Sequence, residues 1–141
     1  MFSLRLRVLV VDDTPIVRAV VRRTLEADGR FDVVAEAPNG RDAIGHAARC
    51  DPDLVLLDLA MPVMDGLEAL PRILEVAPRS QVIVLSAFSA DQMAAQALRA
   101  GACAYLEKTH LAKELIPGIV SSMEERVIEV GGTSDHAPFH A

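Results

Sequence analysis

The chain has 141 residues, of which 51% are hydrophobic and 24% are charged. This length suits one domain with a sizeable core, and the absence of tryptophan predicts a core of aliphatic side chains. The net charge of −6 argues against direct binding to nucleic acid, which relies on a basic surface. Because no apolar stretch has the length of a membrane span or a signal-peptide core, we expect a cytoplasmic protein without membrane contact.

Short apolar segments alternate with segments of helical period along the chain. The expected strands are 8–11, 31–35, 54–57, 81–85 and 102–106. The expected helices are 15–28, 41–50, 67–76, 90–100 and 111–130. The third strand is apolar at every position, which predicts burial on both of its faces. The alternation indicates an α/β fold with a doubly wound, five-stranded parallel sheet.

Local signals mark the helix ends. Thr14 and Pro15 suit the cap and the first position of the first helix. Asn39 and Gly40 together predict a turn before the second helix.

The last helix and the end of the chain carry separate signals. Pro117 and Gly118 should kink or interrupt the last helix, because proline lacks an amide hydrogen and clashes with the preceding turn. After residue 130 the apolar period ends. We therefore expect one domain over 1–130 and a flexible tail over 131–141.

Polar residues follow four of the expected strands. The acids Asp12 and Asp13 follow the first strand, Asp58 the third, Ser86 the fourth and Lys108 the fifth. The carboxyl ends of parallel strands share one edge, where such sheets keep their binding sites. Three carboxylates within about 4 Å of one another repel strongly, so a positive group must offset them. A divalent cation such as Mg²⁺, together with the lysine, would make a phosphoryl-transfer site.

Four separated motifs of the chain carry a family resemblance. They read Val-Leu-Val-Val-Asp12-Asp13, Leu-Leu-Asp58-Leu-Ala-Met-Pro62-Val-Met-Asp-Gly66, Ser86-Ala87 and Tyr105-Leu-Glu-Lys108. In order and spacing, over residues 5–125, the chain resembles the receiver domain of two-component response regulators, in particular the single-domain chemotaxis regulators. The resemblance implies a flavodoxin-like (βα)5 fold with strand order 2-1-3-4-5.

The resemblance also implies a chemistry for this edge of the sheet. Asp58 would accept a phosphoryl group from a histidine kinase or a phosphotransfer protein, with Lys108 and Ser86 contacting phosphoryl oxygens. The chain would catalyse only its own phosphorylation and dephosphorylation, and would otherwise not be an enzyme. Mg²⁺, or alternatively Mn²⁺, would be held by Asp13, Asp58, the backbone carbonyl of Ala60 and, through water, Asp12.

The family further implies a switch. Ser86 would move toward the phosphoryl group and Tyr105 would turn inward into the space that it leaves. The surface made by the fourth helix, fifth strand and fifth helix would then change its contact with an unknown downstream protein, or form a homodimer. A phosphoryl group can bias such an equilibrium only by its different contacts with the two states.

Two departures from the family pattern affect the site. Thr109 stands where many receivers have proline after the lysine, which puts the geometry of that loop in question. Ala60 and Phe88, two residues beyond Asp58 and Ser86, cannot orient an attacking water by hydrogen bonding. We therefore expect slow self-dephosphorylation, and Phe88→Glu should accelerate it.

Three other functions are weighed against this one. The chain could be a receiver that acts as a scaffold without phosphorylation, or the excised receiver of a longer DNA-binding regulator. An aspartate-nucleophile phosphatase of the haloacid dehalogenase type is less favoured. That chemistry needs two acids one residue apart after the first strand, whereas Asp12 and Asp13 are adjacent.

Overall fold

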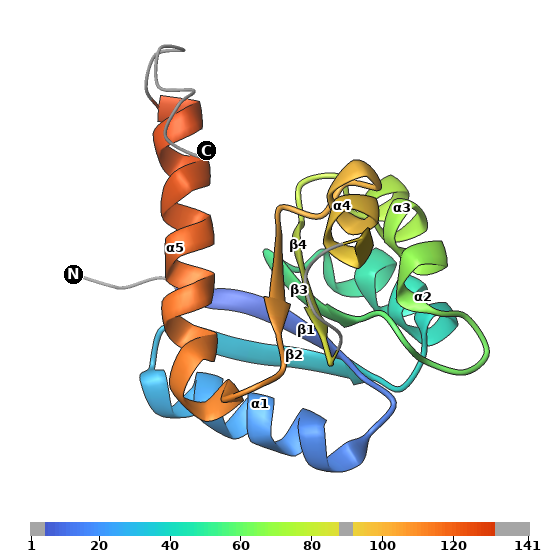
Figure 1. Cartoon of the computed structure of the whole chain (residues 1–141), viewed down its shortest axis with the longest axis horizontal. Coiled ribbons are helices and arrows are strands. Elements are labelled where there is room, and N and C mark those ends of the chain that lie inside the picture. The colour runs from blue at the N-terminus through green and yellow to red at the C-terminus, as the bar shows by residue number, and fades with distance from the viewer. Residues whose placement is uncertain (1–4, 88–91, 132–141) are drawn as a thin grey trace.

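The computed structural model describes residues 5–87 and 92–131. Strands and helices alternate along the whole described chain (Figure 1). The strands are β1 (Leu6–Val11), β2 (Phe31–Ala37), β3 (Leu54–Asp58), β4 (Gln81–Ser86) and β5 (Ala104–Glu107). The helices are α1 (Pro15–Asp28), α2 (Gly40–Cys50), α3 (Gly66–Val76), α4 (Gln92–Arg99) and α5 (Leu111–Gly131). Every element expected from the sequence is present.

The strands form one parallel sheet in the order β2-β1-β3-β4-β5. This is the flavodoxin-like order that the resemblance implied. Val11 pairs with Leu57, and Asp58 pairs with Leu85, so the ends of the three central strands lie at nearly the same level. The register therefore brings the residues that follow these strands to one edge of the sheet.

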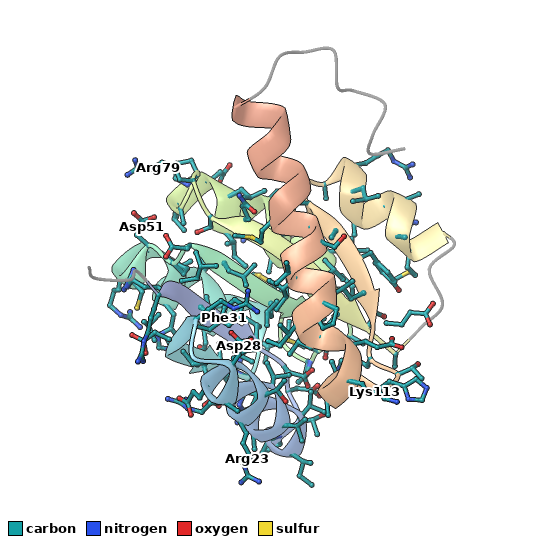
Figure 2. All side chains as sticks on the ribbon, turned by 90° about the vertical axis from the view of Figure 1, so that its left-hand side faces the viewer. Arg23, Asp28, Phe31, Asp51, Arg79 and Lys113 are labelled. Carbon is teal, nitrogen blue, oxygen red and sulfur yellow. The ribbon has the colours of Figure 1, made fainter. Side chains whose placement is uncertain are left out.

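Helices cover both faces of the sheet, with α1 and α5 on one side and α2, α3 and α4 on the other (Figure 1). Figure 2 shows α5 crossing its face of the sheet, next to α1. Neighbouring strand residues point to opposite faces. Thus Leu54 and Leu56 pack toward α1 and α5, while Val55 and Leu57 pack toward α2 and α3. The predicted burial of β3 on both faces is confirmed.

Two helix starts differ from their predictions. Asn39 is the N-cap of α2, and its side chain accepts a hydrogen bond from the Asp42 amide at 2.9 Å, so the expected turn at Asn39 and Gly40 is a helix cap. Thr14 occupies the N-cap position of α1, but its side chain makes no capping bond. Instead, the Thr14 amide donates to Asp12 Oδ1 at 2.9 Å.

Helix α5 runs without interruption from Leu111 to Gly131, so the expected interruption at Pro117 and Gly118 is wrong, while the alternative of a kink stays a prediction. Proline removes only its own amide hydrogen. Leu115 and Ile119 are buried against the sheet on either side of the pair, and their burial keeps the segment helical.

Gly118 has a packing role in α5, because a Cβ at this position would lie 2.8 Å from Leu106 Cδ1 on β5. Residue 131, the first of the expected tail, ends the helix, and residues 132–141 lie outside the described part. None of the helices in the described ranges is long and apolar enough to cross a membrane.

Candidate functional site

Two buried carboxylates and one lysine meet at the carboxyl edge of the sheet. Asp12 directly follows β1, and Asp58 is the last residue of β3. The Lys108 ammonium lies 2.6 Å from Asp12 Oδ2 and 3.2 Å from Asp58 Oδ1. The Asp12 and Asp58 side chains are 3% and 5% exposed, so this ion pairing occurs largely out of water. The structure thus joins three of the side chains that the sequence places after separate strands.

The Asp58 carboxyl is harder to ionise than an ordinary aspartate. Burial raises its pKa to about 6, and the negative charge of Asp12 adds to the rise, while Lys108 opposes it. The Asp58 carboxylate is therefore the main form at neutral pH, yet it is poorly solvated. Such a carboxylate gains much from any added positive charge.

The Lys108 ammonium is stabilised in its charged form. Burial alone would lower its pKa, but the hydrogen bond and charge of Asp12 and the charge of Asp58 outweigh burial and raise the pKa above its usual value. Lys108 is consequently a permanent cation at this edge. Its position does not depend on a proline, because the Lys108–Thr109 peptide bond is trans and the Lys108 amide donates to the Ser86 carbonyl at 2.8 Å.

Asp13 completes a group of acids that suits a divalent cation. Carboxylate oxygens of Asp12, Asp13 and Asp58 all lie within 4.8 Å of one another. Asp13 is exposed, which leaves an open path from solvent. The buried Asp12 Oδ2 has only the Lys108 ion pair and no hydrogen bond of regular geometry in the described part of the chain. An all-oxygen donor set that includes a buried, poorly solvated carboxylate fits Mg²⁺.

The loop after β3 is pressed closely onto the strand end. Gly66 begins α3, and a Cβ there would overlap the Asp58 carbonyl oxygen and approach Leu59 Cα to 2.8 Å. The Gly66 amide donates to the Leu59 carbonyl at 2.9 Å. Val63 has a φ of 70°, a strained conformation for a β-branched residue. The loop that carries Ala60 is therefore held in a compact, strained form beside Asp58.

The remaining predicted residues have different settings. Ser86 is buried at the end of β4. Tyr105 is half-buried and packs against the hydrophobic cluster on the α4 side of the sheet. Ala60 is exposed, and its amide lies 3.4 Å from Asp58 Oδ1. Phe88 lies outside the described residues.

Sequence reasoning missed one contact of the site. Arg18, on α1, donates from Nη1 to the backbone carbonyl oxygen of Asp12 at 2.6 Å. This contact could not be predicted from the sequence, because it depends on how α1 packs against β2. A glutamate on β2, Glu36, holds the other side of the guanidinium at 3.1 Å.

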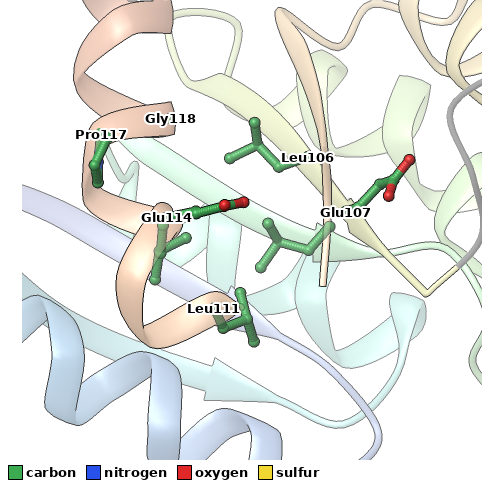
Figure 3. A pocket seen from close by; sticks show the side chains of 8 residues that line it. Leu106, Glu107, Leu111, Glu114, Pro117 and Gly118 are labelled. Atoms are coloured by element: carbon green, nitrogen blue, oxygen red, sulfur yellow. The ribbon is translucent and has the colours of Figure 1, made fainter. Parts of the chain in front are cut away.

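A cavity of about 370 Å³ lies away from the acids, between β5 and α5. Figure 3 shows the carboxylate of Glu114 on α5 directed toward Leu106 on β5, while Glu107 points away from the cavity. Its lining includes leucines from three elements: Leu106 on β5, Leu111 and Leu115 on α5, and Leu85 on β4. The acidic site and this apolar cavity are therefore separate features of the molecule.

The fold and the site together define a class of protein. A parallel sheet in this order, with an acidic pocket and a lysine at its carboxyl edge, is the architecture of receiver domains. The pattern of the response regulator receiver domain family matches residues 8–119. The chain belongs to this family.

Known relatives of the chain differ in length. The chemotaxis protein CheY of Listeria monocytogenes is 37% identical over 114 residues, which cover 81% of this chain and 95% of that protein. A protein-glutamate methylesterase/protein-glutamine glutaminase of Rhodospirillum centenum is 40% identical over 111 residues, which cover 77% of this chain but 28% of that protein. The chain thus spans less than a third of the methylesterase relative.

Solved structures show the same fold. The crystal structure of the CheX-CheY-BeF3-Mg²⁺ complex from Borrelia burgdorferi superposes with a TM-score of 0.80 at 25% sequence identity. The match covers 85% of this chain and 90% of that chain.

Proposed function

We propose that the chain is a phosphoacceptor, in which Asp58 accepts a phosphoryl group and thereby switches a protein-interaction surface. One observation carries this proposal: the buried Asp58 carboxylate lies 3.2 Å from the Lys108 ammonium and beside two further acids. A carboxylate oxygen of Asp58 attacks phosphorus and forms an acyl phosphate, while the donor imidazole leaves with the electron pair of the broken P–N bond. Lys108 and Ser86 contact phosphoryl oxygens and stabilise their charge.

The acids that flank Asp58 are proposed to hold Mg²⁺, with Mn²⁺ as a substitute. Asp13, Asp58 and the Ala60 carbonyl would be direct ligands, and Asp12 would act through water. When bound, the cation supplies positive charge that neutralises phosphoryl oxygens. The fit of the acids supports this assignment, since three carboxylates lie close together and the poorly solvated Asp58 gains from a cation.

The proposed partners follow from membership of the receiver family. The phosphoryl donor is a histidine kinase or a phosphotransfer protein in the cytoplasm. The output is the surface of α4, β5 and α5, which binds a downstream protein or a second copy of the chain. The relative from Borrelia burgdorferi is complexed with CheX, which supports direct contact with another protein. We assign residues 1–130 to this receiver domain.

Ser86 and Tyr105 are proposed to couple the site to that surface. Ser86 is buried at the end of β4, and Tyr105 packs on the α4 side of β5. Movement of the Ser86 hydroxyl toward the phosphoryl group would open space on that side for the Tyr105 ring. The two residues come from neighbouring strands, β4 and β5, which supports the coupling.

Self-dephosphorylation is proposed to be slow. Ala60 is exposed beside Asp58 and offers only a methyl group, so it cannot orient a water for attack on the acyl phosphate. Phe88, which belongs to the same hypothesis, lies outside the described residues. A phosphoryl half-life of seconds would contradict the proposal, whereas Phe88→Glu should shorten a long half-life.

Two of the alternatives fit the structure less well. An unphosphorylated scaffold would be favoured if Thr109, in place of the usual proline, spoiled the site, yet Lys108 reaches both acids. A phosphatase of the haloacid dehalogenase type would use an acid after β1 as nucleophile. In this chain the Asp12 carboxylate already forms an ion pair with the Lys108 ammonium and accepts a hydrogen bond from the Thr14 amide.

Intact-protein mass spectrometry tests the proposal. The protein is incubated with a small acyl phosphate or phosphoramidate donor, with Mg²⁺ or with a chelator. A gain of one phosphoryl group is expected with Mg²⁺ only, and none is expected for Asp58→Asn. No gain in the wild type, or an equal gain in Asp58→Asn, would overturn the assignment.

A further inference from the structure

The side chain of Arg18 links three elements at the back of the acidic pocket. It comes from the first turn of α1, and its Nη1 donates to the backbone carbonyl oxygen of Asp12 at 2.6 Å. Its Nε lies 3.1 Å from Glu36 Oε1 on β2. The Arg18 side chain is 18% exposed, so these contacts are largely shielded from water.

The Arg18 guanidinium is itself held in place. Glu36 also pairs with Arg22, one turn further along α1, so two arginines share the glutamate. A planar guanidinium can bond to two acceptors in fixed directions, which a point charge cannot do. The position of the donated hydrogen bond is therefore set by β2 and α1 together.

The acceptor of this bond is part of the site. The Asp12 carbonyl belongs to the peptide that joins Asp12 to Asp13, so its direction sets where the Asp13 side chain leaves the backbone. The same turn is closed by the Thr14 amide, which donates to Asp12 Oδ1 at 2.9 Å. A rotation of the peptide between the two acids would separate two of the proposed cation ligands.

We infer that Arg18 is a positioning residue for the cation site: by holding the Asp12 carbonyl it fixes the geometry of the two acids after β1. The inference rests on the proposed function of those acids. A plain electrostatic role makes the opposite prediction, because the positive charge of Arg18 would repel a nearby cation. Removal of Arg18 should weaken cation binding if it positions the acids, and should strengthen binding if only its charge matters.

Titration calorimetry with Mg²⁺ alone separates these readings. Arg18→Met is expected to raise the dissociation constant for Mg²⁺ about tenfold, as is usual when a group that orients a metal ligand is removed. The matched control is Arg23→Met, which removes the same charge from an exposed side chain of α1 that points away from the body (Figure 2). The control should leave Mg²⁺ affinity unchanged or slightly increased.

A second measurement uses the protein without metal. Amide hydrogen exchange of Thr14 should accelerate about tenfold in Arg18→Met, because the turn that holds this amide loses its anchor. Exchange in the core of β3 should stay the same, which shows that the variant is folded. Unchanged Mg²⁺ affinity, tighter binding or unchanged Thr14 exchange would each overturn the inference.

Asp13→Asn distinguishes failure of this inference from failure of the proposed function. If the wild type binds Mg²⁺ and Asp13→Asn does not, the cation site stands and the Arg18 variants decide the inference alone. If the wild type does not bind Mg²⁺, or if Asp13→Asn binds it equally well, both the cation site and the inference are overturned.

Discussion

The two edges of the same sheet are built in opposite ways. At the amino edge, polar side chains donate hydrogen bonds to backbone carbonyls. The Arg7 guanidinium donates to the Cys50 carbonyl at 2.6 Å, and the Ser80 hydroxyl donates to the Pro52 carbonyl at 2.5 Å. At the carboxyl edge, the buried Asp58 is costly to ionise, and Asp12 and Asp58 share the Lys108 ammonium.

This difference separates stability from function within one sheet. At the amino edge the Arg7 and Ser80 side chains are satisfied by backbone carbonyls and stabilise the fold, whereas the buried Gln81 Oε1 has no hydrogen-bond partner among the described residues. The carboxyl edge keeps charged groups whose proposed partners, a cation and a phosphoryl group, come from outside. Sites that bind and react commonly keep such groups at the expense of stability.

The largest expected effect of a substitution is on chemistry at the carboxyl edge. Lys108→Ala should lower the rate of phosphorylation from a small donor by about 100-fold or more, because Asp58 loses the one cation that contacts it within residues 5–87 and 92–131. The chain has one other lysine, Lys113, which is exposed on α5 and whose replacement by alanine serves as the control (Figure 2). Wild-type rates in Lys108→Ala, measured by intact mass over time, would contradict the assigned role.

Gly66→Ala tests how tightly the loop is held at this edge. The added methyl group overlaps the backbone of Asp58, so the free energy of unfolding in urea should fall by about 2–3 kcal/mol. The control is Gly45→Ala in α2, where the nearest atom to the new Cβ is 3.6 Å away. That change should raise the free energy of unfolding by about 0.5–1 kcal/mol. Equal effects of the two substitutions would refute the close approach.

Asp58→Asn should stabilise the protein in the absence of metal. The pKa of Asp58 is raised to about 6, so the native state binds this proton more tightly than the unfolded state does. Wild-type stability should therefore increase as the pH falls through about 6 toward the ordinary aspartate pKa of about 4, where the increase is complete.

The gain from Asp58→Asn follows from that pH dependence. At pH 8 it should be about 1–2 kcal/mol, and it should shrink as the pH falls below about 6. Urea titrations in a chelator at several pH values measure it. A variant that is less stable than the wild type at pH 8 would show that the ionised Asp58 side chain does not destabilise the folded state.

Ser80→Ala tests the amino edge, with the smallest expected effect. Loss of the bond to the Pro52 carbonyl should cost about 1 kcal/mol of unfolding free energy. Phosphorylation of Asp58 should be unaffected, because Ser80 lies at the opposite edge of the sheet. A change in phosphorylation rate without a change in stability would contradict the assignment of stability to the amino edge and of function to the carboxyl edge.

The interior of the fold was largely predictable from the sequence. Unbroken apolar runs such as residues 54–57 identify buried parallel strands, and acids directly after such runs identify the site edge. Asp12, Asp13, Asp58 and Lys108 could be assigned to one edge for this reason. The hydrophobic period and the ends of strands are local properties, so they can be recognised in a single sequence.

Features that depend on packing were not predictable in the same way. The uninterrupted course of α5 through Pro117 depends on the burial of Leu115 and Ile119. The contact of Arg18 with the Asp12 carbonyl depends on where α1 lies against β2. Asn39 was assigned to a turn because turns and helix caps favour the same residue, and only the start of α2 decides between them.

The most direct test of the account is to locate the phosphoryl group on the chain. The phosphorylated protein is reduced with borohydride, which converts an acyl phosphate of aspartate to homoserine, and its peptides are then analysed by mass spectrometry. The account predicts homoserine at position 58 alone, and only when Mg²⁺ and the donor are both present. Homoserine at Asp12 or Asp13, or none at all, would contradict the central claim that Asp58 is the phosphoacceptor.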